Sequence, residues 1–284
     1  MPLFVLAFDH RTSLMTKLFE VEGEPGEADV ARARTAKRVI WEGLVGALDD
    51  GRVSRGEAAA LVDTTYGVEV IAAARAAGVR VAVPVEASGR AELAFEELEW
   101  RDRLDALAPA WAKVLIRYNP EGDAAMNARQ RVALGALADH CRATERDLML
   151  ELLVPPEPQH DPATYDANER PGLMVRAIEE LRGDGIEAQV WKIEGLDRRE
   201  DCGRVAAAAG APCIVLGRGA DRDAVDRWLR AGAGVAGFDG FAIGRSIWWP
   251  ALRELFAGEI DDATAAAAIG DEYARYVGVY LDAR

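Results

Sequence analysis

The chain has 284 residues, half of them hydrophobic and 29% charged, and its formal net charge is −14 at pH 7. This length can bury one large core or two modest ones, and the composition is typical of a soluble globular protein. A strongly negative field repels the phosphates of nucleic acids and anionic lipid surfaces. We therefore expect no nucleic-acid partner and no membrane partner, and any anionic substrate must be held by positive groups concentrated in one place.

Neither the cysteines nor the N-terminus indicates an exported protein. Cys141, Cys202 and Cys213 are far apart and lack metal-type spacing, which is typical of reduced thiols. The N-terminal apolar run Leu3–Phe8 is too short for a signal peptide or a membrane segment. These features predict a cytoplasmic protein, and we expect it to need no metal and no cofactor.

Short apolar runs alternate with longer segments in which apolar residues recur every three or four positions. Such alternation predicts parallel strands joined by helices. The expected strands are Leu3–Asp9, Leu61–Thr65, Val81–Glu86, Ala112–Tyr118, Leu148–Val154, Gln189–Glu194, Cys213–Gly217 and Gly240–Arg245. The expected helices are Ala28–Leu48, Val68–Ala77, Ala91–Leu107, Ala124–Ala143, Pro171–Arg182, Arg199–Ala209 and Asp221–Ala231, followed by Pro250–Phe256 and Asp262–Leu281.

Eight strands in a chain of this size predict an α/β fold of the closed (β/α)₈ type, the TIM barrel. An open, doubly wound sheet is the alternative. The first expected strand is followed by Asp9-His10-Arg11-Thr12 rather than by a glycine-rich phosphate-binding turn, which argues against that alternative. No linker or break in composition divides the chain, so we expect a single domain over residues 1–284.

Ionisable residues occur at the carboxyl end of every expected strand. In a barrel this end carries the chemistry, and the runs are otherwise apolar, as strands buried on both faces should be. Charges at so many equivalent positions predict an active site rather than a solvated surface. They are Asp9, Arg11, Asp63, Glu86, Lys113, Arg117, Glu151, Lys192, Glu194, Arg218 and Arg245.

The sixth expected strand places Lys192 and Glu194 two residues apart, on the same face. A structural ion pair is one interpretation. The other is a reactive amine, because desolvation favours the neutral form of a buried lysine. Lysines converging with carboxylates, without clustered histidines, favour a Schiff base in which the amine attacks a ketone and a carboxylate moves protons. A metal held only by acidic residues is the alternative, although the lysines would compete for those residues.

Two glycine-arginine loops follow the last two expected strands, at Gly217-Arg218-Gly219 and Gly244-Arg245-Ser246. Barrels often bind phosphate at these loops, with donors from the backbone and from a following helix. The alternative is that the glycines only form turns. The proline-rich segment Pro155–Arg170 is long for a strand–helix connection, and it is either a lid over the strand ends or a surface excursion.

Motifs along nearly the whole chain resemble a known family. They are "FDHR" at Phe8–Arg11, "KVLIRYNPEGD" at Lys113–Asp123, "LELLVP" at Leu150–Pro155, "VWKIEGLDRREDC" at Val190–Cys202, "CIVLGRGA" at Cys213–Ala220 and "GFAIGRSIW" at Gly240–Trp248. The chain resembles the DUF2090 domain that follows the sugar kinase in bacterial bifunctional 5-dehydro-2-deoxygluconokinase/5-dehydro-2-deoxyphosphogluconate aldolases of inositol catabolism, here expected without the kinase. More distantly it is similar to the class I tagatose-bisphosphate and sulfofructose-phosphate aldolases.

The resemblance implies a class I aldolase whose Schiff-base lysine is Lys192. It further implies catalytic roles for Asp9, for Lys113, which is expected to favour the neutral amine of Lys192, and for Glu151 as general acid and base. The expected substrate is 2-deoxy-5-keto-D-gluconate 6-phosphate, cleaved to dihydroxyacetone phosphate and malonate semialdehyde. The residues expected to bind substrate or phosphate are Arg11, Arg117, Glu194, Gly217, Arg218, Gly219, Gly244, Arg245 and Ser246.

Two alternatives to this function remain open from the sequence. One is an aldolase for another ketose phosphate, such as tagatose bisphosphate or sulfofructose phosphate. The other is a non-catalytic barrel that binds a sugar phosphate. The expected partner is a small phosphorylated keto sugar or sugar acid. The sequence also leaves open a homo-oligomer, in which Trp248–Pro250 and Ala263–Ala268 would be either interface or core.

Overall fold

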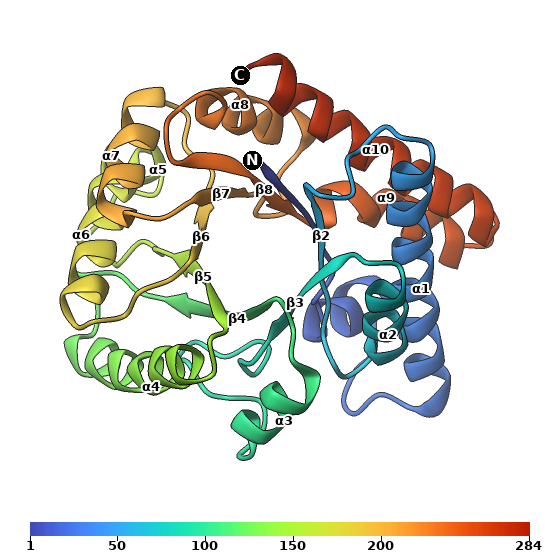
Figure 1. Ribbon diagram of the computed structural model, residues 1–284, viewed down its shortest axis with the longest axis horizontal. Coiled ribbons are helices and arrows are strands. Elements are labelled where there is room, and N and C mark those ends of the chain that lie inside the picture. Colours follow the sequence, from blue (N-terminus) through green and yellow to red (C-terminus); the bar gives the residue numbers. More distant parts are fainter.

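The computed structural model describes residues 1–284 and contains a closed barrel of eight parallel strands. Each strand pairs with its neighbours in sequence, and β8 closes the ring on β1 (Figure 1). The (β/α)₈ fold predicted from the alternating pattern is therefore confirmed. The strands are β1 (Leu3–Ala7), β2 (Ala58–Leu61), β3 (Arg80–Pro84), β4 (Trp111–Arg117), β5 (Asp147–Leu153), β6 (Val190–Glu194), β7 (Cys213–Leu216) and β8 (Phe238–Ile243).

Helices form a ring outside the strands (Figure 1). None of them combines the length and the apolar character that crossing a membrane requires. They are α1 (Glu27–Asp49), α2 (Val68–Ala76), α3 (Trp100–Leu107), α4 (Ala124–Ala143), α5 (Tyr165–Asn168), α6 (Arg170–Gly183), α7 (Arg199–Ala209), α8 (Arg222–Gly232), α9 (Arg245–Phe256) and α10 (Asp262–Asp282), with a five-residue π-helix, η1 (Leu14–Leu18), after β1.

Alternate residues of the strands fill the barrel with an apolar inner layer. Because side chains on a strand alternate between its two faces, the residue two places after an inner-layer residue faces the same way. Met149 on β5 is thus followed by Glu151, and Val190 on β6 by Lys192. The charged residues therefore lie directly above this layer. The inner layer comprises Leu3, Val5, Ala7, Ala59, Leu61, Ala82, Trp111, Met149, Val190, Ile214 and Ala242.

The last two helices pack against the strands that close the barrel. Trp248 of α9 is buried, and its indole Nε1 donates to the carbonyl of Ala7 at 2.9 Å. From α10, the hydroxyls of Tyr273 and Tyr280 donate to the carbonyls of Phe4 (2.7 Å) and Phe238 (2.6 Å). Trp248 is therefore part of the core rather than of a surface patch.

The boundaries of β2, α3 and α9 differ from the sequence predictions. β2 covers Ala58–Leu61 instead of Leu61–Thr65, because buried alanines, which have weak strand preference, form the strand. Residues 91–99, predicted to begin a helix, instead fold back on β3, where Glu96 N–H donates to the carbonyl of Val85 at 2.9 Å.

β8 ends at Ile243, and α9 begins at Arg245 rather than at Pro250. Pro250 lies inside the helix, which is held by buried residues on both sides of the proline, among them Trp248 and Leu252. Tertiary packing therefore overrides the preference of proline for a first turn. The earlier start places the N-terminus of α9 at the carboxyl ends of the strands.

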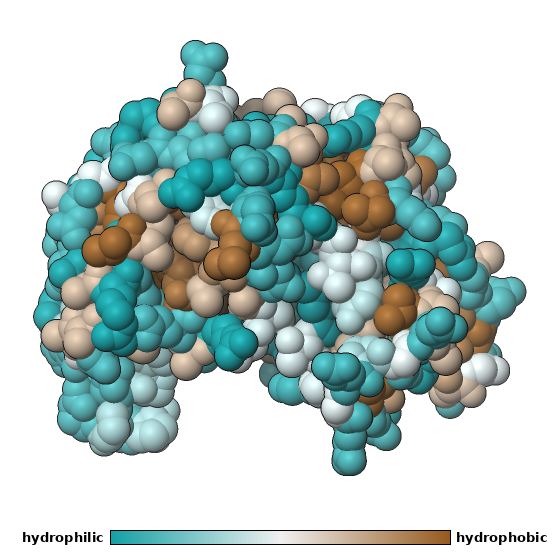
Figure 2. All heavy atoms as spheres, turned by 90° about the horizontal axis from the view of Figure 1, so that it is seen from below, coloured by the Kyte–Doolittle hydropathy of each residue, from teal (hydrophilic) through white to brown (hydrophobic).

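The surface is mostly hydrophilic on the face shown in Figure 2, where hydrophobic residues appear in separate groups. The large hydrophobic residues that are most exposed, apart from Met1, are Leu98, Val132 and Val68, and they belong to different parts of the chain. Isolated exposed residues of this kind are ordinary for a soluble protein.

Candidate active site

A cavity of about 610 Å³ opens at the carboxyl ends of the strands. Its lining includes residues that follow or end every strand except β2. All four residues predicted to be catalytic line it, namely Asp9, Lys113, Glu151 and Lys192. The apolar inner layer closes the floor of the cavity, so the charged groups lie at the boundary between the packed core and the opening.

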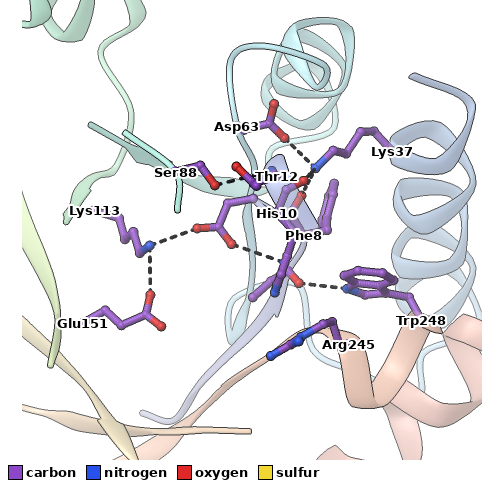
Figure 3. Close-up of polar contacts among 12 residues, drawn as sticks. Phe8, His10, Thr12, Lys37, Asp63, Ser88, Lys113, Glu151, Arg245 and Trp248 are labelled. Atoms are coloured by element: carbon purple, nitrogen blue, oxygen red, sulfur yellow. Dashed lines mark hydrogen bonds and ion pairs between the residues drawn. The ribbon is translucent and has the colours of Figure 1, made fainter. Parts of the chain in front are cut away.

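Lys113 of β4 is the centre of a buried ion cluster at the base of the cavity. Its Nζ lies 3.0 Å from Asp9, 2.5 Å from Glu86 and 2.9 Å from Glu151, and Figure 3 shows the contact with Glu151. Burial alone would lower the pKa of Lys113, but the three carboxylates outweigh burial and raise it well above the ordinary value. Lys113 is therefore held as a fixed ammonium ion.

Lys192 of β6 lies beside this cluster. Its Nζ is 2.9 Å from Oε2 of Glu151, the same oxygen that Lys113 contacts. Glu151 and Lys192 are register partners on β5 and β6, so pairing of the strands brings them together. Glu151 is the only acidic residue within 4.0 Å of the Lys192 amine. Lys192 therefore has fewer ionic contacts to lose than Lys113 when its amine acts as a nucleophile.

The use of lysine in this chain is unusual. Only four of the 34 basic Lys and Arg residues are lysines. Three of them, Lys37, Lys113 and Lys192, are 3% exposed or less, although lysine is almost never fully buried unless it is paired. The fourth, Lys17, is exposed. Arginine thus carries most of the positive charge of the chain, and the buried lysines mark positions where a compact amine is needed.

The three carboxylates around Lys113 differ in their proton affinity. Burial would raise the pKa of Asp9 and of Glu151, but the charges of Lys113 and Lys192 lower both below their ordinary values. For Glu86 burial prevails, and its pKa is raised despite the contact with Lys113. Asp9 and Glu151 are therefore carboxylates at neutral pH, while Glu86 holds its proton more tightly.

The structure has no group of three or more acidic, His or Cys residues arranged to hold a metal ion.

The raised pKa of Glu86 predicts how stability depends on pH. The folded protein binds this proton more tightly than the unfolded chain, so the resulting stabilisation is present at low pH and is lost as pH rises through the folded-state value. We therefore expect the free energy of unfolding of Glu86→Gln, measured relative to wild type, to be higher at about pH 7 than at about pH 4. Denaturant titrations at the two pH values measure this difference.

The matched control is Glu92→Gln. Glu92 is a partly exposed glutamate whose pKa is lowered by a hydrogen bond from Arg129. The contribution of Glu92 to stability is lost as pH falls and gained as pH rises. The free energy of unfolding of Glu92→Gln should therefore fall relative to that of wild type over the same rise in pH. If the free energies of unfolding of both variants fall relative to wild type as pH rises, the assignment for Glu86 is contradicted.

Arg245 and His10 form the side of the cavity next to β8 and β1. Arg245 has no carboxylate within 4.0 Å; its Nη2 donates to the carbonyl of Arg218 at 3.0 Å, and burial lowers its pKa. Burial also lowers the pKa of His10 to about 3, despite the nearby charge of Asp9, so the imidazole is neutral. Its ring packs edge-on against Trp248 at 5.2 Å (Figure 3).

Two of the predicted glycines are needed for close approach. A Cβ at Gly219, which has φ +70°, would lie 2.8 Å from the guanidinium of Arg245. A Cβ at Gly244 would lie 2.3 Å from the carbonyl oxygen of Ala7. These glycines therefore make room for Arg245 and for contact between β8 and β1, beyond their function as turns.

Arg218 and Glu194 pair with each other rather than facing an empty site. Arg218 lies 3.3 Å from Glu194 and 2.9 Å from Asp166, and Arg170 lies 3.7 Å from Glu194. Burial raises the pKa of Glu194 despite the two arginines. Because Asp166 and Arg170 belong to the proline-rich segment Pro155–Arg170, these contacts hold that segment against the β6–β7 side of the cavity.

The other residues predicted to bind substrate differ in whether they line the cavity and in whether their side chains already have partners. Arg11 donates to the carbonyl of Glu86 at 2.7 Å and pairs with Glu96 at 3.0 Å. Arg117 lines the cavity, and no carboxylate lies within 4.0 Å of it. Ser246 does not line the main cavity; its hydroxyl donates to the carbonyl of Ala220 at 2.8 Å beside an adjoining cavity.

Glu86, His10 and Arg170 had no predicted catalytic or binding role. Glu86 was predicted as a charge at a strand end, and its position two residues after Pro84, which is buried, is the signal that it faces inward. His10 follows Asp9 directly, but nothing local indicates that its ring turns toward Trp248. Arg170 reaches Glu194 only because of how the Pro155–Arg170 segment folds.

The fold and the site define a (β/α)₈ barrel with a buried lysine–carboxylate cluster at the carboxyl ends of its strands. The chain belongs to the DUF2090 family, described as an uncharacterized protein conserved in bacteria, and the family model matches residues 1–284. The family part of the sequence resemblance is thereby confirmed. Among curated proteins, no sequence matches the chain significantly.

Solved structures with the same fold include fructose-bisphosphate aldolases. The enzyme of Plasmodium falciparum, solved with TRAP and an inhibitor, is 13% identical, with a TM-score of 0.67 over 97% of this chain and 90% of that chain. An archaeal fructose-1,6-bisphosphate aldolase, whose catalytic lysine is bound to a carbinolamine intermediate, is 13% identical, with a TM-score of 0.59 over 96% and 94% of the two chains. A protein of Corynebacterium glutamicum is 18% identical, with a TM-score of 0.59 over 99% and 86%. At these identities the similarity establishes the fold.

Proposed function

We propose that this protein is a class I aldolase in which Lys192 forms a Schiff base with a ketose phosphate. The observation that carries the proposal is the pair of buried amines on one carboxylate oxygen of Glu151, with Lys113 fixed by two further carboxylates. Three carboxylates hold Lys113 as a cation, so Lys192 is the amine left to act as the nucleophile. The archaeal aldolase with a lysine-bound carbinolamine supports the same chemistry on this fold.

In the proposed reaction, the Lys192 amine attacks the substrate carbonyl carbon. Glu151 carries the proton that the amine loses to the former carbonyl oxygen, which gives a carbinolamine. It then takes up a second proton from solvent and delivers it to the carbinolamine hydroxyl, so that water leaves and a protonated imine forms. Glu151, again a carboxylate, then takes the proton of the β-hydroxyl, the carbon–carbon bond breaks, and the electron pair of that bond moves into the imine to give an enamine as the aldehyde leaves. Protonation of the enamine at carbon, followed by addition of water, releases the ketone product and restores the amine.

Arg245 and the N-terminus of α9 are the proposed phosphate site. The guanidinium has no acidic partner, and the first turn of a helix offers unpaired backbone N–H groups to an anion. Gly217, Gly219 and Gly244 keep the nearby backbone close enough to take part. The side chain of Arg218 is engaged by Glu194 and Asp166, so it contributes only after exchanging these partners.

The proposed substrate is 2-deoxy-5-keto-D-gluconate 6-phosphate, which this chemistry cleaves to dihydroxyacetone phosphate and malonate semialdehyde. Its far carboxylate needs a second cation, and Arg117 supports this choice because it lines the cavity without an acidic partner. Arg11 is less free, since it already pairs with Glu96. Side-by-side assays against tagatose bisphosphate and sulfofructose phosphate decide among the substrates.

Borohydride trapping tests the proposed chemistry. We expect sodium borohydride, added to the protein with dihydroxyacetone phosphate, to reduce the imine and leave the triose phosphate on Lys192. The presence of only four lysines makes mapping by mass spectrometry direct. The control is the same incubation without borohydride. An adduct on Lys113 or on Lys17 would overturn the assignment, and the absence of an adduct with every candidate substrate would overturn the proposal.

A further inference from the structure

Lys37 of α1 is a buried lysine outside the cavity. Its Nζ donates to the backbone carbonyls of Phe8 and, at 2.8 Å, of His10, and it forms an ion pair with Asp63 at 2.5 Å. Figure 3 shows these contacts beside the loop that follows β1. Lys37 is 1% exposed and Asp63 is 0% exposed. Neither residue lines the cavity, so the proposed chemistry does not use them directly.

Stability alone is a weak explanation for this buried pair. Removing two charges from water costs about as much as their attraction returns, and hydrophobic replacements of similar volume are often neutral or stabilising. The two carbonyls that Lys37 binds belong to the residues on either side of Asp9. They lie beyond the end of β1 at Ala7, where strand pairing ends soon after Phe8 N–H donates to the carbonyl of Leu61. Lys37 therefore supplies the donors that the strand ladder no longer provides.

Asp63 fixes the position of the Lys37 amine. One carboxylate oxygen pairs with Lys37, and the other accepts the backbone N–H of Tyr66 at 2.7 Å. Since Asp63 follows β2, the neighbour of β1 in the barrel, the pair ties the end of β2 to the end of β1. The inward charge that follows β2 thus serves the adjacent strand rather than the cavity.

We propose that Lys37, held by Asp63, is a positioning residue that sets the backbone of Asp9 and thereby the alignment of Lys113 with the Glu151–Lys192 pair. The connection is continuous: from Lys37 to the carbonyls on either side of Asp9, from Asp9 to Lys113 at 3.0 Å, and from Lys113 through Oε2 of Glu151 to Lys192 at 2.9 Å. The inference rests on the proposed function, because it assigns Lys37 to the alignment of that site.

The test removes both charges of the pair. Lys37→Met alone would leave a buried, unpaired carboxylate, which is strongly destabilising. The double variant Lys37→Met/Asp63→Asn leaves neither charge, and the asparagine oxygen can still accept the N–H of Tyr66. We expect it to fold, to lose the Asp9–Lys113 contact in its crystal structure, and to show kcat lowered about 10- to 100-fold with KM changed less than about threefold.

The matched control is Arg38→Met/Asp262→Asn. Arg38 is also on α1 and pairs with Asp262 at 2.5 Å, but both side chains are about half exposed. Exposed pairs contribute little, so we expect this variant to retain wild-type kcat and KM. It controls for the loss of one ion pair from α1 with the same net change in charge.

A mutant cycle with Asp9→Asn tests whether Lys37 acts through Asp9. If it does, adding Lys37→Met/Asp63→Asn to Asp9→Asn causes little further loss of kcat, whereas independent effects multiply. An intact Asp9–Lys113 contact in the double variant, an unchanged kcat, or multiplying losses would each overturn the inference. If wild type still forms the adduct on Lys192, the proposed function survives that outcome; if wild type forms no adduct, both fall.

Discussion

Replacement of Lys192 by methionine is expected to lower kcat by on the order of 10⁴-fold or more, about 5 kcal/mol in activation free energy. The proposed reaction needs an amine that forms a covalent imine, and methionine preserves the length of the side chain without one. The other buried amine in the cavity cannot substitute, because Asp9, Glu86 and Glu151 hold Lys113 as an ammonium. Steady-state rates with the proposed substrate, together with borohydride trapping, measure the effect.

This variant should still fold and bind phosphate. Glu151 keeps Lys113 as its cationic partner at 2.9 Å when Lys192 is lost, so the substitution leaves no unpaired buried carboxylate. Arg245 and the N-terminus of α9 are untouched, so the affinity for inorganic phosphate should change little. Thermal unfolding and phosphate titration check both points. A folded Lys192→Met protein that retains more than about 1% of wild-type kcat would rule out the proposed role of the amine.

The barrel and its central amines could be predicted because both depend on local patterns. Short apolar runs separated by helical segments define the strands, and side chains on a strand alternate with a period of two residues. Lys113, Glu151 and Lys192 each follow a residue of the inner layer by two positions. Their inward direction and their place at the carboxyl ends therefore follow from the strand assignment alone.

The wrong boundaries arise where tertiary contacts outweigh local preference. The alanines Ala58–Ala60 are weak strand formers, but they are fully buried in β2 between neighbouring strands. Residues 91–99 have helix-forming side chains, yet pairing with the end of β3 and stacking of Phe95 on Trp100 at 4.5 Å hold them in another conformation. Neither set of contacts can be inferred from a short window of sequence.

The partners of the charged residues were less predictable than their positions. Arg218 stands in a glycine loop that is typical of phosphate sites, but the structure pairs it with Asp166 and Glu194. Asp166 reaches it because the Pro155–Arg170 segment packs over β6 and β7, which spacing along the chain does not reveal. Lys37 similarly occurs in an ordinary helical pattern, and only the scarcity of lysines in the sequence singles it out.

Glu151→Gln is expected to lower kcat by about 10²- to 10⁴-fold, because the proposed proton transfers depend on this carboxylate. The amide can still accept one hydrogen bond, but it cannot carry a proton, and it leaves two amines facing each other without a negative charge between them. The charges of Lys113 and Lys192 lower the pKa of Glu151 although burial opposes them. The ordinary pKa of glutamate lies near 4. Any loss of wild-type activity caused by protonation of Glu151 should therefore appear only at pH values below this. The same pH-dependent loss should be absent in Glu151→Gln.

Glu86→Gln provides the matched comparison, since it makes the same chemical change on the same ion cluster. Glu86 contacts Lys113 at 2.5 Å but makes no ion pair with Lys192. We expect its kcat to fall less than about tenfold, while Glu151→Gln also slows formation of the borohydride-trapped imine. If the two variants lose activity equally, the charge of the cluster rather than the proton carried by Glu151 limits the rate. If Glu86→Gln loses more, the proton-transfer role belongs to Glu86, because the order of the two effects depends on which carboxylate exchanges a proton with the Lys192 amine.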